Sequence, residues 1–156
     1  MARNPKERVV SHPPLFTTFK PAGIVGIKLG SVTLELDEYE SIRLADYEGL
    51  EHEQAAEAMG ISRSTFTRLV ERARKKFASM LVDGLKLTIN GGSIHFKENL
   101  FQCLDCNHLF KSTIHEAEAP CPLCRSHHLV DFAKGFGHGR CCRNKTHKNG
   151  CKNFKE

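Results

Sequence analysis

The chain has 156 residues, of which 40% are apolar and 26% are charged. Such a chain is too apolar to be wholly disordered, and its length suits one ordinary domain or two small ones. No apolar run approaches the roughly 18 residues of a membrane span, and the basic, polar start lacks the form of a signal peptide. We therefore expect a cytoplasmic protein whose 7 cysteines are metal ligands or redox groups rather than structural disulfides.

The net charge of +5 is distributed in three blocks. Residues 35–57 hold nine acids and one base, residues 62–76 hold six bases and one acid, and residues 134–155 hold seven bases and no acid. A polyanion would be attracted to the second and third blocks, although the whole chain is only mildly basic. We expect the acidic block to form a solvated helix face that lies away from such a partner.

Residues 1–30 are predicted to form an irregular arm. They contain four prolines and three glycines, and they show no sustained apolar period. We expect the arm to dock on the rest of the chain through three apolar side chains: Leu15, Phe16 and Phe19.

Regular structure is predicted to begin after this arm. Apolar residues alternate with polar ones at positions 32–36, which indicates a short strand. Asp37 followed by Glu40 has the form of a capping box, so we predict a helix from there to about Tyr47, with Gly49 ending it. This helix is expected to bury three side chains: Tyr39, Ile42 and Ala45.

Residues 52–77 have the pattern of a helix-turn-helix. Small and apolar residues at positions 55–59 predict a short helix, Gly60 allows a tight turn, and Ser62 can cap a second helix. Apolar residues then recur at spacings of three and four, as expected for the buried face of that second helix. They are Phe66, Leu69, Val70, Ala73 and Phe77.

The other face of the second helix carries polar and basic residues. In a recognition helix the first residues contact base edges in the major groove, and bases further along contact phosphates. The predicted base contacts are Arg63, Ser64, Thr67 and Arg68, and the predicted phosphate contacts are Arg72, Arg74, Lys75 and Lys76. The alternative is an ordinary solvated basic face. The filled helix-turn-helix positions favour DNA binding over that alternative.

Residues 85–96 are predicted to form a β-hairpin. Apolar and polar residues alternate at positions 85–89, and the alternation resumes at Ile94 and Phe96. Between them, Asn-Gly-Gly at positions 90–92 is a strong turn signal.

Three runs resemble a known family: FKPAGI (19–24), LDEYESIRLADYEGL (36–50) and AAEAMGISRSTF (55–66). They are similar to small uncharacterised proteins of bacteria and archaea that are classed as DNA-binding, with a helix-turn-helix similar to region four of the sigma factors. The resemblance covers roughly residues 1–92. It implies a compact three-helix domain with the helix from Ser62 in the major groove. One departure is Glu51-His52, where a better helix cap such as serine is expected.

Two Cys-x-x-Cys pairs, Cys103/Cys106 and Cys121/Cys124, are separated by fourteen residues, which is close to the usual four-cysteine zinc spacing. Each pair can form a knuckle, a tight turn that directs two sulfurs at one metal, and two knuckles complete a tetrahedron. We predict a small β-rich zinc ribbon at residues 99–133, with zinc favoured over iron and over disulfide or dithiol redox chemistry. A closed four-thiolate site is structural, because it leaves no position for substrate.

Residues near these pairs give further expectations. Asn107 suits the left-handed backbone position after the first knuckle, whereas Arg125 stands where glycine is often found after the second. Four histidines are close enough in sequence to be rival ligands, but we expect them at the surface or behind the thiols. They are His108, His115, His127 and His128.

Residues 134–156 are predicted to be a flexible basic tail that adds nonspecific affinity for phosphates. The alternative is a second metal or redox site that uses Cys141, Cys142 and Cys151, with His138 or His147 as a further ligand. Its spacing matches no standard ligand pattern.

The chain is thus predicted to be a mainly α, helix-turn-helix domain at residues 31–98 with a short hairpin, followed by the ribbon and the tail. The leading hypothesis is a sequence-specific regulator of transcription that binds double-stranded DNA. One alternative is a module of the transcription machinery whose ribbon contacts RNA polymerase or another protein, and a second is a metal-responsive or redox-responsive regulator that uses the C-terminal cysteines. An enzyme is disfavoured, because there is no phosphate loop, nucleophile with its base, or open metal site with a carboxylate.

Overall fold

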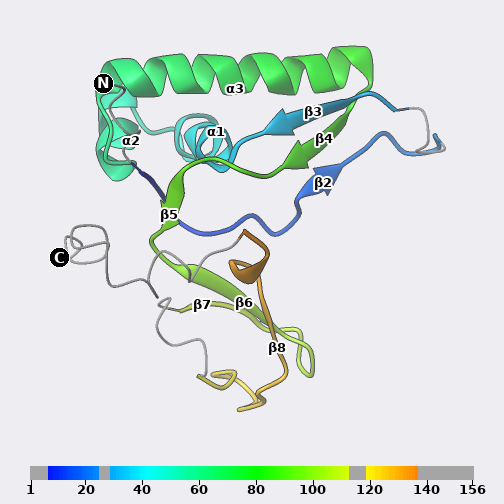
Figure 1. Cartoon of the computed structure of the whole chain (residues 1–156). Helices are drawn as coiled ribbons and strands as arrows, with labels where there is room; N and C mark the ends of the chain where they lie inside the picture. Colours follow the sequence, from blue (N-terminus) through cyan, green and yellow to red (C-terminus); the bar gives the residue numbers. More distant parts are fainter. Residues whose placement is uncertain (1–6, 25–28, 113–118, 137–156) are drawn as a thin grey trace. The chain divides into compact units, whose positions relative to one another are not determined.

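The computed structural model describes residues 7–24, 29–112 and 119–136. The chain divides into two compact units, residues 1–95 and residues 96–156 (Figure 1). None of the described helices combines the length and the apolar character that crossing a membrane requires.

Three α-helices belong to the first unit. They are α1 (Leu36–Ile42), α2 (His52–Ala58) and α3 (Arg63–Asp83). A π-helical turn at Arg43–Tyr47 continues α1, and Gly49, with a φ of 71°, follows that turn. The predicted helix up to Tyr47 and the glycine stop are confirmed, although the last turn is π-helical rather than α-helical.

The predicted capping box at Asp37 and Glu40 is wrong. The N-cap is Glu35, whose backbone amide donates a hydrogen bond of 2.8 Å to the carboxylate of Glu38. Asp37 and Glu40 are buried and form ion pairs with arginines instead.

Strands β2 (Thr18–Phe19), β3 (Ser31–Leu34) and β4 (Lys86–Ile89) form a sheet in the order β2-β4-β3. The central strand β4 is antiparallel to β2 and parallel to β3. All three helices lie in the connection between β3 and β4, as a parallel pair requires a long crossover. Helix α3 runs along this sheet (Figure 1).

The predicted hairpin at residues 85–96 is wrong. Strand β4 pairs with β2 and β3, whereas β5 (Ile94–Phe96) pairs with β1 (Arg8–Val10). Gly91 and Gly92 have φ values of 79° and 93°, so the turn signal was sound. The carbonyl of Gly91 accepts a hydrogen bond of 3.2 Å from the Leu36 amide, which ties this turn to the start of α1 rather than closing β4 on β5.

The first 30 residues were predicted to form an irregular arm, but their described part contributes β1 and β2. The docking side chains also differ from the prediction. Leu15, Phe16 and Phe19 are exposed, whereas Val9 and Val10 of β1 are buried. A backbone hydrogen bond explains why β1 docks: the Val9 amide donates to the Met59 carbonyl at 3.1 Å and holds β1 against the end of α2.

The core beside α2 is made of buried side chains from α2, α3 and the turn after α1. They are Leu44, Ala55, Ala56, Met59, Phe66, Leu69 and Val70. The predicted apolar face of α3 is therefore confirmed as far as Ala73, which is also fully buried. The prediction is wrong for Phe77, which is 44% exposed and lies beyond the part of α3 that packs in this cluster.

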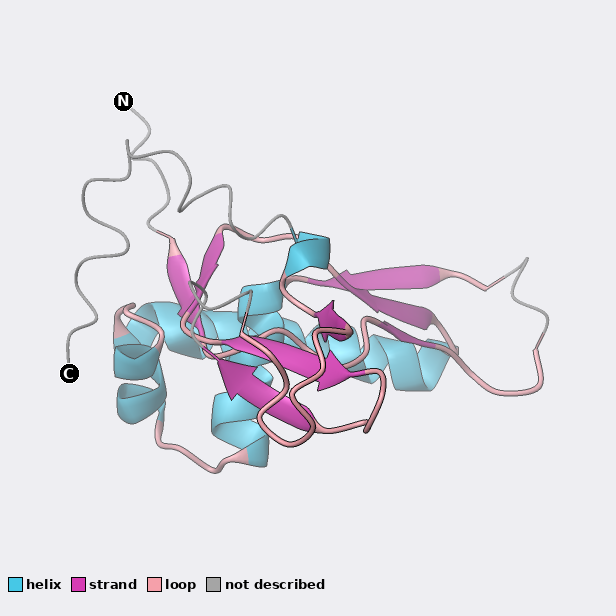
Figure 2. Cartoon of the chain, turned by 90° about the horizontal axis from the view of Figure 1, so that it is seen from below, coloured by secondary structure: helices cyan, strands magenta, loops and turns pink. Residues whose placement is uncertain are grey.

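The second unit has a three-stranded antiparallel sheet; the strands of both units are magenta in Figure 2. Strand β6 (Asn99–Cys103) lies between β7 (Leu109–Ser112) and β8 (Leu129–Asp131). A short 3-10 turn, Lys134–Phe136, follows β8. The expectation of a β-rich module is confirmed here, and the rest of the predicted tail lies outside the described residues.

Candidate nucleic-acid interface and metal centre

Helices α2 and α3 are joined by a tight turn. Gly60 has a φ of 65°, and the Ile61 amide donates a hydrogen bond of 3.0 Å to the Ala56 carbonyl. The Ser62 hydroxyl then caps α3 by accepting a hydrogen bond of 3.3 Å from the Thr65 amide. The predicted short helix, glycine turn and serine cap are all present.

Helix α2 begins without a side-chain cap at Glu51, in line with the departure expected there. Its first residue, His52, instead contacts α3. The His52 Nδ1 lies 3.0 Å from the Thr67 Oγ1, and the imidazole packs edge-on against the ring of Phe66, with 5.3 Å between the ring centroids. His52 thus links the starts of the two helices, a role that no local sequence pattern indicates.

The predicted base-contacting residues do not have equal freedom. Arg63, Ser64 and Arg68 are exposed on α3. The Thr67 hydroxyl, by contrast, donates a hydrogen bond of 3.1 Å to the Arg63 carbonyl and is also bonded to His52. Thr67 therefore has no hydroxyl proton left to donate to a base edge in this conformation.

The predicted phosphate-contacting residues also fall into two groups. Arg72 and Lys76 both donate to the carboxylate of Glu38 on α1, at 2.7 Å and 2.6 Å. Arg74 forms a 2.7 Å ion pair with Asp46. Within the described ranges of the chain, the guanidinium groups of Arg63 and Arg68 and the ammonium group of Lys75 form no ion pair.

The expectation of a solvated acidic face is wrong for α1, although the later acids of the block are exposed: Asp46, Glu48, Glu51, Glu53 and Glu57. Asp37, Glu38 and Glu40 are 2%, 0% and 1% exposed. Burial raises the pKa of Glu38, but hydrogen bonds from Lys76, the Glu35 amide and Arg72 outweigh it and hold the pKa below its usual value. The charged carboxylate is therefore the stable form, and it joins α1 to α3.

Glu40 is held in the same way. Burial raises its pKa, but Arg43 and Ser11 donate hydrogen bonds to the carboxylate and lower the pKa below its usual value. The acids therefore occupy three of the five buried positions of α1, while the predicted core residues of this helix are only half-buried: Tyr39, Ile42 and Ala45.

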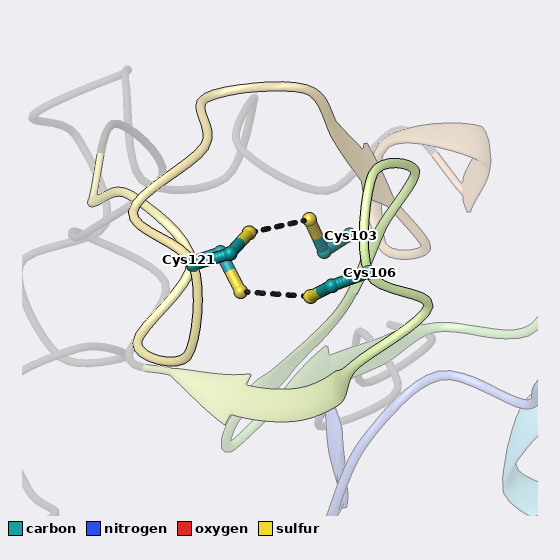
Figure 3. A group of neighbouring side chains, drawn as sticks. Cys103, Cys106 and Cys121 are labelled. Carbon is teal, nitrogen blue, oxygen red and sulfur yellow. Dashed lines mark hydrogen bonds between the residues drawn. The ribbon is translucent and has the colours of Figure 1, made fainter.

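The four cysteines of the two Cys-x-x-Cys pairs come together in the second unit (Figure 3). The Sγ atoms of Cys103 and Cys124 are 3.5 Å apart, and those of Cys106 and Cys121 are 3.6 Å apart. All four sulfurs lie within 4.8 Å of one another. A tetrahedral zinc ion with Zn–S bonds of about 2.3 Å requires sulfurs about 3.8 Å apart, so these thiols fit one such ion.

The two knuckles have the same backbone design. The Cys103 amide donates to the His108 carbonyl at 2.9 Å, and the Cys121 amide donates to the Ser126 carbonyl at 2.8 Å. Each knuckle has a left-handed residue at the equivalent place, Asn107 with a φ of 58° and Arg125 with a φ of 61°. The predicted conformation of Asn107 is confirmed, and Arg125 adopts it despite its side chain.

The thiols differ in acidity. Burial raises the pKa of Cys103, but the amides of Cys106 and Asp105 and the neighbouring thiols lower it to about 7. The His108 amide lowers the pKa of Cys106, while burial and the other three thiols raise it to about 12. One thiolate is thus accessible near neutral pH, and a bound metal would displace the remaining protons.

The histidines near the thiols are not part of the sulfur group in the described residues. The His108 ring stacks on Phe110, with 5.9 Å between ring centroids. The exposed His128 lies 3.3 Å from the carboxylate of Asp105. Six of the residues named as candidate ligands lie outside the described residues: His115, His138, Cys141, Cys142, His147 and Cys151.

Comparison with known protein families identifies the family of this chain. The model of a family described as "Protein of unknown function DUF134" matches residues 1–97. The chain belongs to this family. The DUF134 match ends close to the boundary between the two units at residue 95.

Bacterial relatives named "UPF0251 protein" extend the similarity into the second unit. The relative from Chloroherpeton thalassium is 46% identical over 136 residues, which are 85% of this chain and 90% of that protein. The one from Pelotomaculum thermopropionicum is 43% identical over 126 residues (81% and 95%), and the one from Clostridium novyi is 36% identical over 148 residues (95% and 98%). No solved structure matches the chain. The DUF134 family is thus a family of uncharacterised bacterial proteins, and these names attach no activity to it.

Proposed function

We propose that this protein is a sequence-specific DNA-binding regulator of transcription. In this proposal α2 and α3 are a helix-turn-helix, similar to region four of the sigma factors, and α3 enters the major groove of double-stranded DNA. The turn at Gly60, the Ser62 cap and the small buried Ala56 support the assignment, because a recognition helix must be held firmly across a tight crossing.

The proposal rests on the cations of α3 that have no acidic partner among the described residues. Arg63 and Arg68 at the start of α3 and Lys75 further along are exposed and lack an ion-pair partner in the described part of the chain, whereas the other cations of α3 are bonded to acids. Charges without an internal partner are free to bind a polyanion. On a helix face that only contacts solvent, we would expect no such division between paired and unpaired cations.

The proposed contacts follow from these partners. Arg63, Ser64 and Arg68 contact base edges, since arginine can hold guanine through two hydrogen bonds and serine can donate or accept. Thr67 contributes through its methyl group and its position. Lys75 is the main phosphate contact, and Arg72 and Lys76 contribute less because Glu38 holds them.

We also propose that the four clustered cysteines hold one structural zinc ion, with iron as the alternative metal. The thiol spacing of the two knuckles supports this assignment. A metal held on four thiolates would supply much of the folding free energy of so small a unit. The folded ribbon then serves as a rigid platform for DNA backbone, dimerisation or a protein of the transcription machinery.

A selection from random double-stranded DNA tests the proposed function, run on the full chain with and without a chelator. We expect an enriched sequence that is lost in a double variant, Arg63→Ala with Arg68→Ala. A selection that enriches no sequence under either condition would refute sequence-specific binding. Enrichment that persists in chelator would show that recognition belongs to α2 and α3 alone.

A further inference from the structure

Asp105 lies between the two cysteines of the first knuckle, and its side chain contacts the second knuckle. The Ser126 hydroxyl donates to one carboxylate oxygen, and the other oxygen lies 3.3 Å from Nδ1 of His128. We call this group of three residues the knuckle latch. It connects the two knuckles through groups other than the thiols.

Both partners of Asp105 are themselves fixed by the backbone. The Ser126 carbonyl accepts from the Cys121 amide at 2.8 Å, and the Ser126 hydroxyl accepts from the His128 amide at 3.0 Å. The His128 carbonyl accepts from the Leu104 amide at 2.9 Å. Hydrogen bonds therefore connect the two knuckles in both directions: Ser126 and His128 bond to the Asp105 side chain, and the Leu104 amide of the first knuckle bonds to the His128 carbonyl.

The knuckle design does not by itself require such a latch. Because the two knuckles repeat the same backbone bonds, the counterpart of Asp105 in the second knuckle is Leu123, and the counterpart of Ser126 in the first is His108. Leu123 is 68% exposed, and the His108 ring stacks on Phe110. In the described portion of the second unit, Asp105 therefore bridges the two knuckles on one side. The equivalent pair on the other side, Leu123 and His108, offers no carboxylate for such a bridge.

We infer that Asp105 is a positioning residue for the metal site, which holds the two knuckles at the sulfur spacing of a metal-bound tetrahedron and thereby slows metal release. The inference rests on the metal site of the proposed function. A metal held by thiols from two knuckles leaves when the knuckles separate, and any such separation must break the latch. Groups that hold ligands in place without touching the metal commonly change metal affinity by 10- to 100-fold.

The test uses the full chain loaded with Co²⁺ and then mixed with excess chelator, and it measures the rate of metal release. Asp105→Ala should release metal roughly tenfold faster than the unaltered chain. Asp105→Asn keeps an oxygen that accepts from Ser126 and should fall in between. The matched control is Glu98→Gln, which removes a carboxylate of the same unit that is 3.8 Å from Lys111 and outside the latch. It should leave the release rate unchanged.

The absorption spectrum of bound Co²⁺ distinguishes a latch from a ligand. The spectrum should stay that of four thiolates in Asp105→Ala and in His128→Ala, because neither side chain touches the metal. A changed spectrum would overturn the inference, and so would an unchanged release rate in Asp105→Ala. If Asp105→Ala fails to fold, Ser126→Ala provides the same comparison, with faster release expected and an unchanged rate contradicting the latch.

The metal content of the unaltered chain tests the metal site independently of the latch. An unaltered chain that takes up no Co²⁺ would refute the metal site, and the latch with it. Uptake of one ion per chain, with equal release rates in all variants, would refute only the latch.

Discussion

The carboxylate of Glu38 lies 2.6 Å from the ammonium nitrogen of Lys76. Glu38 is on α1 and fully buried, while Lys76 is on α3 and partly exposed. Arg72 donates to the other carboxylate oxygen at 2.7 Å. An acid that looks like part of a solvated face therefore joins two helices, and it pairs with two of the cations that the sequence pattern assigns to DNA phosphates.

Replacing Glu38 by glutamine should destabilise the first unit by about 2 kcal/mol. The substitution removes a charge that accepts hydrogen bonds from Lys76, Arg72 and the Glu35 amide, and the exposure of the two cations limits the loss. Urea unfolding followed by helical circular dichroism measures it. The control is Glu57→Gln on the exposed face of α2, which should change the free energy of unfolding by less than about 0.5 kcal/mol. Equal effects of the two substitutions would contradict a structural role for Glu38.

The same carboxylates should make the first unit sensitive to acid. The pKa values of Glu38 and Glu40 are held below the usual value of 4.5. The stability they contribute is therefore fully present above about pH 4.5 and is lost as the pH falls through their lowered pKa values. Urea unfolding at pH 7 and at about pH 3.5 should show this loss. Glu38→Gln should lose less stability over this interval, and a loss equal to that of the unaltered chain would rule out Glu38 as a source of the acid sensitivity.

The proposed DNA contacts predict different effects for different cations of α3. Arg63→Ala or Arg68→Ala should each cost about 1–3 kcal/mol on the selected sequence and relax its specificity. Lys75→Ala should weaken binding to all sequences alike and reduce the salt slope by about one. Arg74→Ala is the matched control, because Arg74 is already paired with Asp46 and should have the smallest effect. Binding titrations at several salt concentrations measure all four variants, and a uniform loss across them would indicate a nonspecific basic face.

Local patterns were sufficient for the parts of the fold that depend on neighbouring residues. The turn at Gly60, the Ser62 cap and the left-handed Asn107 are each set within a few residues, and the four cysteines were identified from their spacing alone. These features obey short-range rules of capping, turn geometry and ligand spacing.

The features that sequence patterns missed depend on partners far along the chain. Glu38 finds Arg72 and Lys76 at separations of 34 and 38 residues, so a local pattern identifies only a polar position. Strands β4 and β5 are separated by a sound turn signal, yet they pair with strands from elsewhere in the chain. Pairing is decided by the free energy of the whole sheet, which a turn alone does not specify.

Arg125 provides a further test in the second knuckle. Its φ of 61° is a conformation that costs a residue with a Cβ roughly 1 kcal/mol relative to glycine. Its side chain is exposed. Arg125→Gly should therefore stabilise the metal-loaded second unit by up to about 1 kcal/mol, the gain being reduced because glycine also adds freedom to the unfolded chain. Arg125→Val should destabilise it, because a branched side chain tolerates this conformation poorly.

The matched position in the first knuckle makes this prediction specific. Asn107 has almost the same φ, 58°, but asparagine adopts the left-handed conformation at low cost. Asn107→Gly should therefore change the stability less than Arg125→Gly does. Competition for the bound metal, measured on the full chain against a chelator of known affinity, reports both effects because folding and metal binding are coupled in so small a unit. Weaker metal binding by Arg125→Gly than by the unaltered chain would show that the arginine side chain has a role that backbone strain does not explain.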